Sequence, residues 1–168
     1  MKILIVEDYP MNSLILEKIL IKEGYEVRVA NNGEEGLSRL FASKYDAIIT
    51  DIMMPKMDGI EFISKIRCNI SDPPPILVLT AISSKEIREK ALSLGADIYL
   101  SKPVSPKEVL DSVEKCIALR NQPINASKIN RLEKTHGKSP FIGVFIGAST
   151  GGPNALKTLF TDFSYPEA

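Results

Sequence analysis

Five polar residues end or follow short apolar runs in the first 120 residues. Glu7 and Asp8 follow one run, Asp51 follows another, and Thr80 and Lys102 mark the ends of two more. Clustered carboxylates repel one another and therefore need a cation, and ligation by carboxylate and water oxygens suits Mg²⁺. A lysine ammonium and a hydroxyl suit phosphoryl oxygens, and a carboxylate can itself become an aspartyl phosphate. Each residue alone is more typical of a solvated loop or a helix cap, so a phosphate site requires that all five meet.

Five apolar runs alternate with five helical patterns. This alternation predicts an α/β fold, a doubly wound five-stranded parallel sheet with helices on both faces. In such a sheet, ligands bind beyond the carboxyl ends of the strands, where the five polar residues fall. We expect strands at Lys2–Val6, Tyr25–Val29, Tyr45–Thr50, Ile76–Thr80 and Asp97–Leu100.

Capping signals and apolar spacing predict the helices. Asp58 can cap one helix, while Ser83 with Glu86 and Ser105 with Glu108 have capping-box spacing. The expected apolar faces are Met11, Leu14, Ile15 and Ile19; Leu37, Leu40 and Phe41; Ile60, Ile63 and Ile66; and Val109, Leu110, Val113 and Ile117.

Four motifs in residues 1–120 match a known family in both residue type and spacing. They are ILIVED (Ile3–Asp8), DIMMPKMDG (Asp51–Gly59), Leu79-Thr80 and DIYLSKP (Asp97–Pro103). With these motifs the segment closely resembles the receiver domain of two-component response regulators.

The resemblance implies a role for each site residue. Asp51 would be the phospho-acceptor, and Thr80 and Lys102 would contact the phosphoryl group. Tyr99 would be the switch aromatic, turning inward after phosphorylation, and the Lys102-Pro103 bond would be cis. The implied Mg²⁺ ligands are Glu7, Asp8, Asp51 and the backbone carbonyl of Met53. A histidine kinase would be the phosphodonor, and whether phosphorylation drives dimerisation stays open.

The rest of the chain differs in composition. Residues 121–139 are polar and basic with no strong period, which indicates a linker. Phe141–Ile146 is a candidate strand, and Asn154–Phe160 a candidate helix. Between them, Gly147-x-Ser149-x-Gly151 fits the bend on which some hydrolases place a nucleophilic serine. A glycine-rich turn without chemistry is the open alternative.

A receiver, a linker and the sequence IGASTGGPNAL (Ile146–Leu156) together resemble the chemotaxis protein-glutamate methylesterases. The resemblance makes Ser149 the nucleophile of a Ser-His-Asp triad that acts on chemoreceptors. The family's His and Asp come later than Ser149, whereas the single histidine of this chain, His136, precedes it. We therefore expect residues 140–168 to be an N-terminal fragment of the catalytic domain, lacking competent esterase activity.

Composition and sequence pattern also bear on partners, membrane insertion and cellular location. The 21 basic and 21 acidic residues balance, and no helix-turn-helix pattern follows the linker, so we expect no nucleic-acid partner. No run suits a membrane span, and two widely separated cysteines favour the cytoplasm. A stand-alone receiver with an inert tail remains an alternative. A Mg²⁺-dependent phosphohydrolase would want a second aspartate where Met53 stands.

Overall fold

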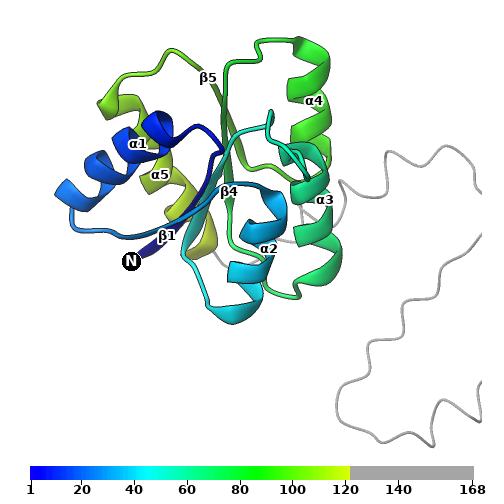
Figure 1. Ribbon diagram of the computed structural model, residues 1–168, viewed down its shortest axis with the longest axis horizontal. Helices are drawn as coiled ribbons and strands as arrows, with labels where there is room; N and C mark the ends of the chain where they lie inside the picture. The colour runs from blue at the N-terminus through cyan, green and yellow to red at the C-terminus, as the bar shows by residue number, and fades with distance from the viewer. Residues whose placement is uncertain (122–168) are drawn as a thin grey trace, which may run out of the picture. The chain divides into compact units, whose positions relative to one another are not determined.

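One parallel sheet contains all five predicted strands, in the order β2-β1-β3-β4-β5 (Figure 1). The computed structural model describes residues 1–121, and the doubly wound α/β prediction is confirmed there. The order reverses between β1 and β3, which is where such sheets bind ligands. The strands are β1 (Lys2–Val6), β2 (Glu26–Ala30), β3 (Ala47–Thr50), β4 (Ile76–Thr80) and β5 (Ile98–Ser101).

The helices cover both faces of the sheet. In Figure 1, α1 and α5 lie on one side, with α2, α3 and α4 on the other. Side chains alternate along β1, so that Ile3 and Ile5 pack with α1 and α5 while Leu4 and Val6 pack with the opposite layer. Both layers exclude water from the central strands, which explains why the sequences of β1, β3 and β4 are almost wholly apolar. The helices are α1 (Pro10–Lys22), α2 (Gly33–Ala42), α3 (Gly59–Asn69), α4 (Lys85–Ser93) and α5 (Pro106–Asn121).

Side-chain caps begin the helices near the predicted positions. The carboxylate of Asp58 accepts from the backbone N–H of Glu61 at 2.8 Å. The Ser105–Glu108 capping box is confirmed, because each side chain bonds the other residue's backbone N–H. The Ser83 prediction is wrong by one residue: Ser84 caps α4, and its hydroxyl donates to Glu86 at 2.6 Å. Local pattern could not distinguish two adjacent serines.

The predicted apolar face of α1 is also wrong. Met11, Leu14 and Ile15 are exposed, whereas Leu16 and Leu20 enter the core. Apolar residues surround this helix, so their spacing did not single out the face that meets the sheet. A similar error affects α2, where Leu37 and Leu40 pack against the core but Phe41 is 66% exposed.

The predicted linker and the methylesterase-like segment, with His136 and Ser149, lie outside the described residues. Within residues 1–121, no helix combines the length and apolar character needed to span a bilayer.

Candidate functional site

Strand register brings the predicted polar residues to one edge of the sheet. Val6 pairs with Thr50, so the next residues, Glu7 and Asp51, lie on neighbouring strands. Beyond β4, the backbone N–H of Lys102 donates to the Thr80 carbonyl at 2.7 Å. Residues far apart in the chain thereby meet at the carboxyl ends of β1, β3, β4 and β5.

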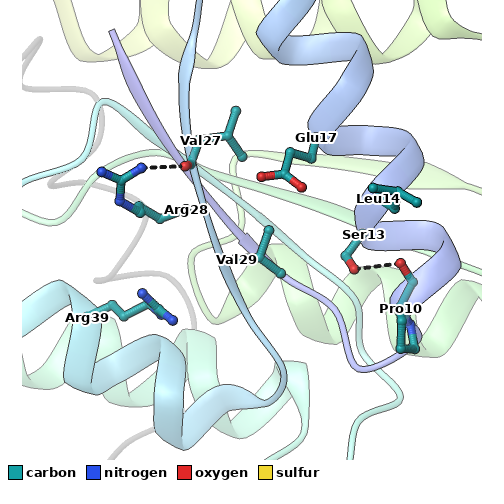
Figure 2. Close-up of a pocket in the computed structure, with 8 residues that line it drawn as sticks. All are labelled: Pro10, Ser13, Leu14, Glu17, Val27, Arg28, Val29 and Arg39. Carbon is teal, nitrogen blue, oxygen red and sulfur yellow. Dashed lines mark hydrogen bonds between the residues drawn. The ribbon is translucent and has the colours of Figure 1, made fainter.

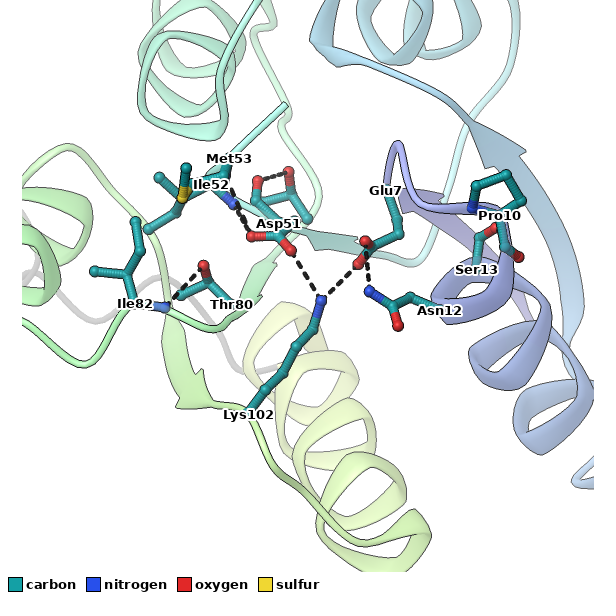
Figure 3. A network of polar contacts seen from close by, with 11 residues as sticks. Glu7, Pro10, Asn12, Ser13, Asp51, Ile52, Met53, Thr80, Ile82 and Lys102 are labelled. Carbon is teal, nitrogen blue, oxygen red and sulfur yellow. Dashed lines mark hydrogen bonds and ion pairs between the residues drawn. The ribbon is translucent and has the colours of Figure 1, made fainter. Parts of the chain in front are cut away.

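Lys102 joins the two buried carboxylates at this edge (Figure 3). Its Nζ lies 2.7 Å from Glu7 Oε2 and 2.8 Å from Asp51 Oδ2. Glu7 is only 2% exposed and Asp51 8%, so water screens these charges poorly. The ammonium offsets the repulsion that would otherwise oppose two carboxylates at this spacing.

The ionisation of Lys102 reflects this position. Burial disfavours the ammonium, but hydrogen bonds and Coulombic attraction from Asp51 and Glu7 outweigh that cost. The pKa of Lys102 is consequently raised above its usual value. The lysine remains a cation throughout the neutral range.

The loop after β3 holds the other oxygen of Asp51. Oδ1 accepts from the backbone N–H groups of Ile52 and Met53. Gly59 closes this loop, because its N–H donates to the Ile52 carbonyl at 2.9 Å. A Cβ at Gly59 would lie 2.1 Å from the Asp51 carbonyl oxygen, so only glycine permits this approach. The loop thus orients Asp51 through backbone contacts that require a glycine eight residues later.

The donor set fits a hard cation, although it is not gathered into a finished metal cage. Glu7 and Asp51 face one position, and the Lys102 ammonium marks that position as favourable for positive charge. Asp8 is exposed at the same rim. Within residues 1–121, no three acidic, Cys or His side chains converge closely enough to hold a metal as they stand. The Mg²⁺ ligand set, including the Met53 carbonyl, therefore stays a prediction.

Thr80 and Tyr99 both form hydrogen bonds with the backbone of Ile82. The N–H of Ile82 donates to Thr80 Oγ1 at 3.4 Å, and the Ile82 carbonyl accepts from the Tyr99 hydroxyl at 2.7 Å. Tyr99 is only 7% exposed, and burial raises the pKa of its phenol. Tyr99 lies inward with its hydroxyl bonded in this structure, and its turning inward after phosphorylation stays a prediction. The Lys102-Pro103 peptide bond is cis, as predicted.

Two contacts at the site escaped the sequence analysis. Asn12, in the first turn of α1, donates from Nδ2 to Glu7 Oε1 at 2.9 Å. The second is the backbone of Ile82 between Thr80 and Tyr99. A polar residue five positions after Glu7 was the only available signal for Asn12, and no pattern in the sequence marks a backbone contact.

A surface cavity of about 510 Å³ lies against α1, β2 and α2 (Figure 2). Its two arginines have partners of their own: Arg28 donates to the Val27 carbonyl at 3.0 Å, and Arg39 pairs with Glu35 at 2.6 Å. The cavity lining includes none of the residues at the sheet edge, which are Glu7, Asp8, Asp51, Thr80 and Lys102. The reactive groups therefore gather at the sheet edge and not in this cavity.

Comparison with known proteins agrees with this geometry. The family model described as response regulator receiver domain matches residues 3–114. The alkaline phosphatase synthesis transcriptional regulatory protein PhoP of Bacillus subtilis is 42% identical over 108 residues, which are 64% of this chain and 45% of that protein. The chain spans about half the length of the curated relatives it matches.

Two similar solved structures contain magnesium. Response regulator TrrA of Thermotoga maritima, in complex with Mg²⁺-BeF, is 38% identical with a TM-score of 0.63, covering 68% of this chain and 97% of that chain. The receiver domain of sensor histidine kinase PA1611 from Pseudomonas aeruginosa has magnesium in its active-site cleft. It is 32% identical with a TM-score of 0.65, covering 70% of this chain and 97% of that chain.

Proposed function

Because the chain belongs to the response regulator receiver family, whose members are phosphorylated by histidine kinases, we propose that Asp51 is its phospho-acceptor. The observation that carries the proposal is the position of the Lys102 ammonium, between the Asp51 and Glu7 carboxylates at the edge where β1 and β3 end. This arrangement supports the proposal because it brings a buried carboxylate, a lysine cation and a second acid together in one site.

The transfer follows from these groups. A carboxylate oxygen of Asp51 attacks the phosphorus of a phosphohistidine, the O–P bond forms as the P–N bond breaks, and the imidazole nitrogen keeps the electron pair. Backbone N–H groups of Ile52 and Met53 hold Oδ1 during the attack. Lys102 stabilises negative charge that develops on the phosphoryl oxygens.

Mg²⁺ would be held by Glu7, Asp8, Asp51 and the Met53 carbonyl. When bound, it supplies Lewis-acid neutralisation of phosphoryl oxygens. The magnesium in the active-site cleft of the PA1611 receiver and the Mg²⁺-BeF complex of TrrA support this assignment.

Thr80 would transmit the effect of phosphorylation from Asp51 to the rest of the domain. Its hydroxyl accepts from the Ile82 N–H, so its own proton is available to a phosphoryl oxygen. Movement of Thr80 toward that group would disturb Ile82 and, through the Ile82 carbonyl, Tyr99. The loop between β4 and α4 would then change the surface that a partner meets.

Phosphate incorporation tests the acceptor. The full chain is incubated with Mg²⁺ and acetyl phosphate, and covalent phosphate is measured by intact mass. Wild type should gain one phosphoryl group, and Asp51→Asn should gain none. Asp72→Asn is the matched control, because the Asp72 carboxylate is 80% exposed and pairs only with Arg120 among the contacts of residues 1–121. Equal labelling of wild type and Asp51→Asn would refute the assignment.

We retain chemoreceptor demethylation by an intact parent as a hypothesis about the output. It rests on the sequence around Ser149 alone, and the comparisons lend it no support, because the relatives named above are described as transcriptional regulators or receiver domains. A stand-alone receiver with an inert tail is the alternative. Methanol release from methylated receptor by this chain, lost in Ser149→Ala, would refute our expectation that residues 140–168 are an incomplete catalytic domain.

A further inference from the structure

Asn12 contacts the acidic site but has no part in the function proposed above. It lies in the first turn of α1, and its side-chain amide donates to Glu7 Oε1 at 2.9 Å (Figure 3). Its own backbone N–H bonds the Tyr9 carbonyl at 3.0 Å, which ties the residue to the start of the helix. A side chain anchored on a helix is held more accurately than one on a loop.

The burial of Glu7 makes this contact important. A carboxylate removed from water needs hydrogen-bond donors for both oxygens. Oε2 accepts from Lys102 at 2.7 Å, and Asn12 supplies the donor that the structure shows for Oε1. Asn12 therefore fixes the orientation of the Glu7 carboxylate, holding one oxygen while the other faces Lys102.

The chemistry of an amide suits this task. The Asn12 amide is neutral, so it satisfies Oε1 without competing with Lys102 or a metal ion for the negative charge of Glu7. A cationic side chain in its place would neutralise Glu7 and weaken its attraction for Mg²⁺. An apolar side chain would leave Oε1 without a donor, and the carboxylate would rotate to recover one.

We propose that Asn12 is a positioning residue that presents Glu7 Oε2 to the cation beside Asp51, and so sets the Mg²⁺ affinity of the site. The proposal rests on the proposed function, since it assumes that Mg²⁺ binds between these acids. Removing a hydrogen-bond partner of a metal-binding side chain lowers metal affinity by about 10- to 100-fold. Asn12→Ala should weaken Mg²⁺ binding to that extent.

Ser13→Ala provides a matched control. Ser13 is buried in the same turn of α1, and its hydroxyl donates to the Pro10 carbonyl at 3.0 Å without touching Glu7. Asn12→Ala and Ser13→Ala each remove one side-chain hydrogen bond from the first turn of α1, but only Asn12→Ala loses a contact with Glu7. An effect on local structure would therefore weaken Mg²⁺ binding in both variants, whereas loss of Glu7 positioning would weaken it in Asn12→Ala alone.

Calorimetric titration of the full chain with MgCl₂ tests the proposal, with urea unfolding measured in parallel. The expected result is weaker binding by Asn12→Ala and wild-type affinity for Ser13→Ala. Asn12→Ala that binds Mg²⁺ as tightly as wild type, or equal weakening by both variants, overturns the role of Asn12. That failure leaves Asp51 labelling intact, whereas a wild type that takes neither Mg²⁺ nor phosphate overturns the proposed function as well.

A measurement on wild type decides the matter if Asn12→Ala fails to fold. The side-chain NH₂ resonances of Asn12 should shift during a Mg²⁺ titration, because the carboxylate to which they donate becomes a metal ligand. Asn12 resonances that stay in place while other site resonances shift would overturn the proposal.

Discussion

The Tyr99 hydroxyl donates to the backbone carbonyl of Ile82 at 2.7 Å, across the loop that joins β4 to α4. The N–H of the same residue donates to Thr80 Oγ1 at 3.4 Å, so the backbone of Ile82 connects Tyr99 to the residue expected to contact the phosphoryl group.

Tyr99→Phe isolates the hydroxyl. The ring still fills its site, but the Ile82 carbonyl loses a donor, so the free energy of unfolding should fall by about 1 kcal/mol. Urea denaturation should show a lower midpoint with an unchanged slope. Tyr9→Phe is the control, because Tyr9 is exposed and should change stability little. Equal stability of Tyr99→Phe and wild type would show that this bond contributes nothing.

Lys102→Met removes the cation between two buried carboxylates. Because Glu7 and Asp51 would then face each other uncompensated, we expect a loss of about 2 to 4 kcal/mol in unfolding free energy at pH 7. Mg²⁺ should offset most or all of this loss, because binding adds about 2.7 kcal/mol at a concentration 100 times its dissociation constant.

Urea unfolding with and without MgCl₂ measures both effects of Lys102→Met. Lys65→Met serves as the control, because Lys65 pairs with Glu61 at 2.8 Å on the surface of α3. Such an exposed pair contributes only about 0.3 to 0.5 kcal/mol. A Lys102→Met chain that matches Lys65→Met in stability would contradict the bridging role of Lys102.

Gly59→Ala tests the loop that holds Asp51. The new Cβ would overlap the Asp51 carbonyl oxygen, so the loop must move, at a cost of about 3 kcal/mol. Phosphate incorporation should slow as well, since the acceptor moves with the loop. Gly24→Ala separates steric overlap from backbone strain: Gly24 has φ of +83° and open space around it. Gly24→Ala should lower the free energy of unfolding by only about 1 to 2 kcal/mol. Equal losses in Gly24→Ala and Gly59→Ala would argue against steric overlap at Gly59.

The two cysteines should differ in reactivity. Cys68 is exposed, whereas Cys116 is buried, and burial raises the pKa of its thiol to about 12. A thiol reagent at pH 8 should therefore modify one cysteine rapidly and the second only after unfolding. Cys68→Ser should remove the fast phase. Two fast thiols in the native chain would contradict the burial of Cys116.

The same pKa predicts how stability depends on pH. Below the ordinary thiol pKa of 9.0 the Cys116 thiol is neutral in both folded and unfolded chains, so it adds no pH dependence. As pH rises from 9.0 toward about 12, the thiol ionises in the unfolded chain first, and stability should fall. Cys116→Ala should flatten this alkaline decline in a urea titration series.

Much of the fold could be predicted because its signals are local or periodic. The run Ile76–Thr80 is predicted as a buried strand from its own residues. Asp58 marks a helix start by its residue type, and Ser105 by its spacing to Glu108. The positions of acids at strand ends followed in turn, since parallel strands share one carboxyl edge. Periodicity failed on α1, where apolar residues surround the helix and only docking to the sheet selected Leu16 and Leu20.

The sequence was enough to predict which residues reach the carboxyl edge of the sheet. Glu7, Asp51 and Lys102 each follow a predicted strand, and parallel strands end at the same edge. How these residues meet depends on the tertiary fold. Lys102 contacts Glu7 across 95 positions of the chain, and Asn12 on α1 bonds the other oxygen of the Glu7 carboxylate. Such contacts depend on strand register and side-chain rotamers that packing sets together, and no local pattern in the chain encodes them.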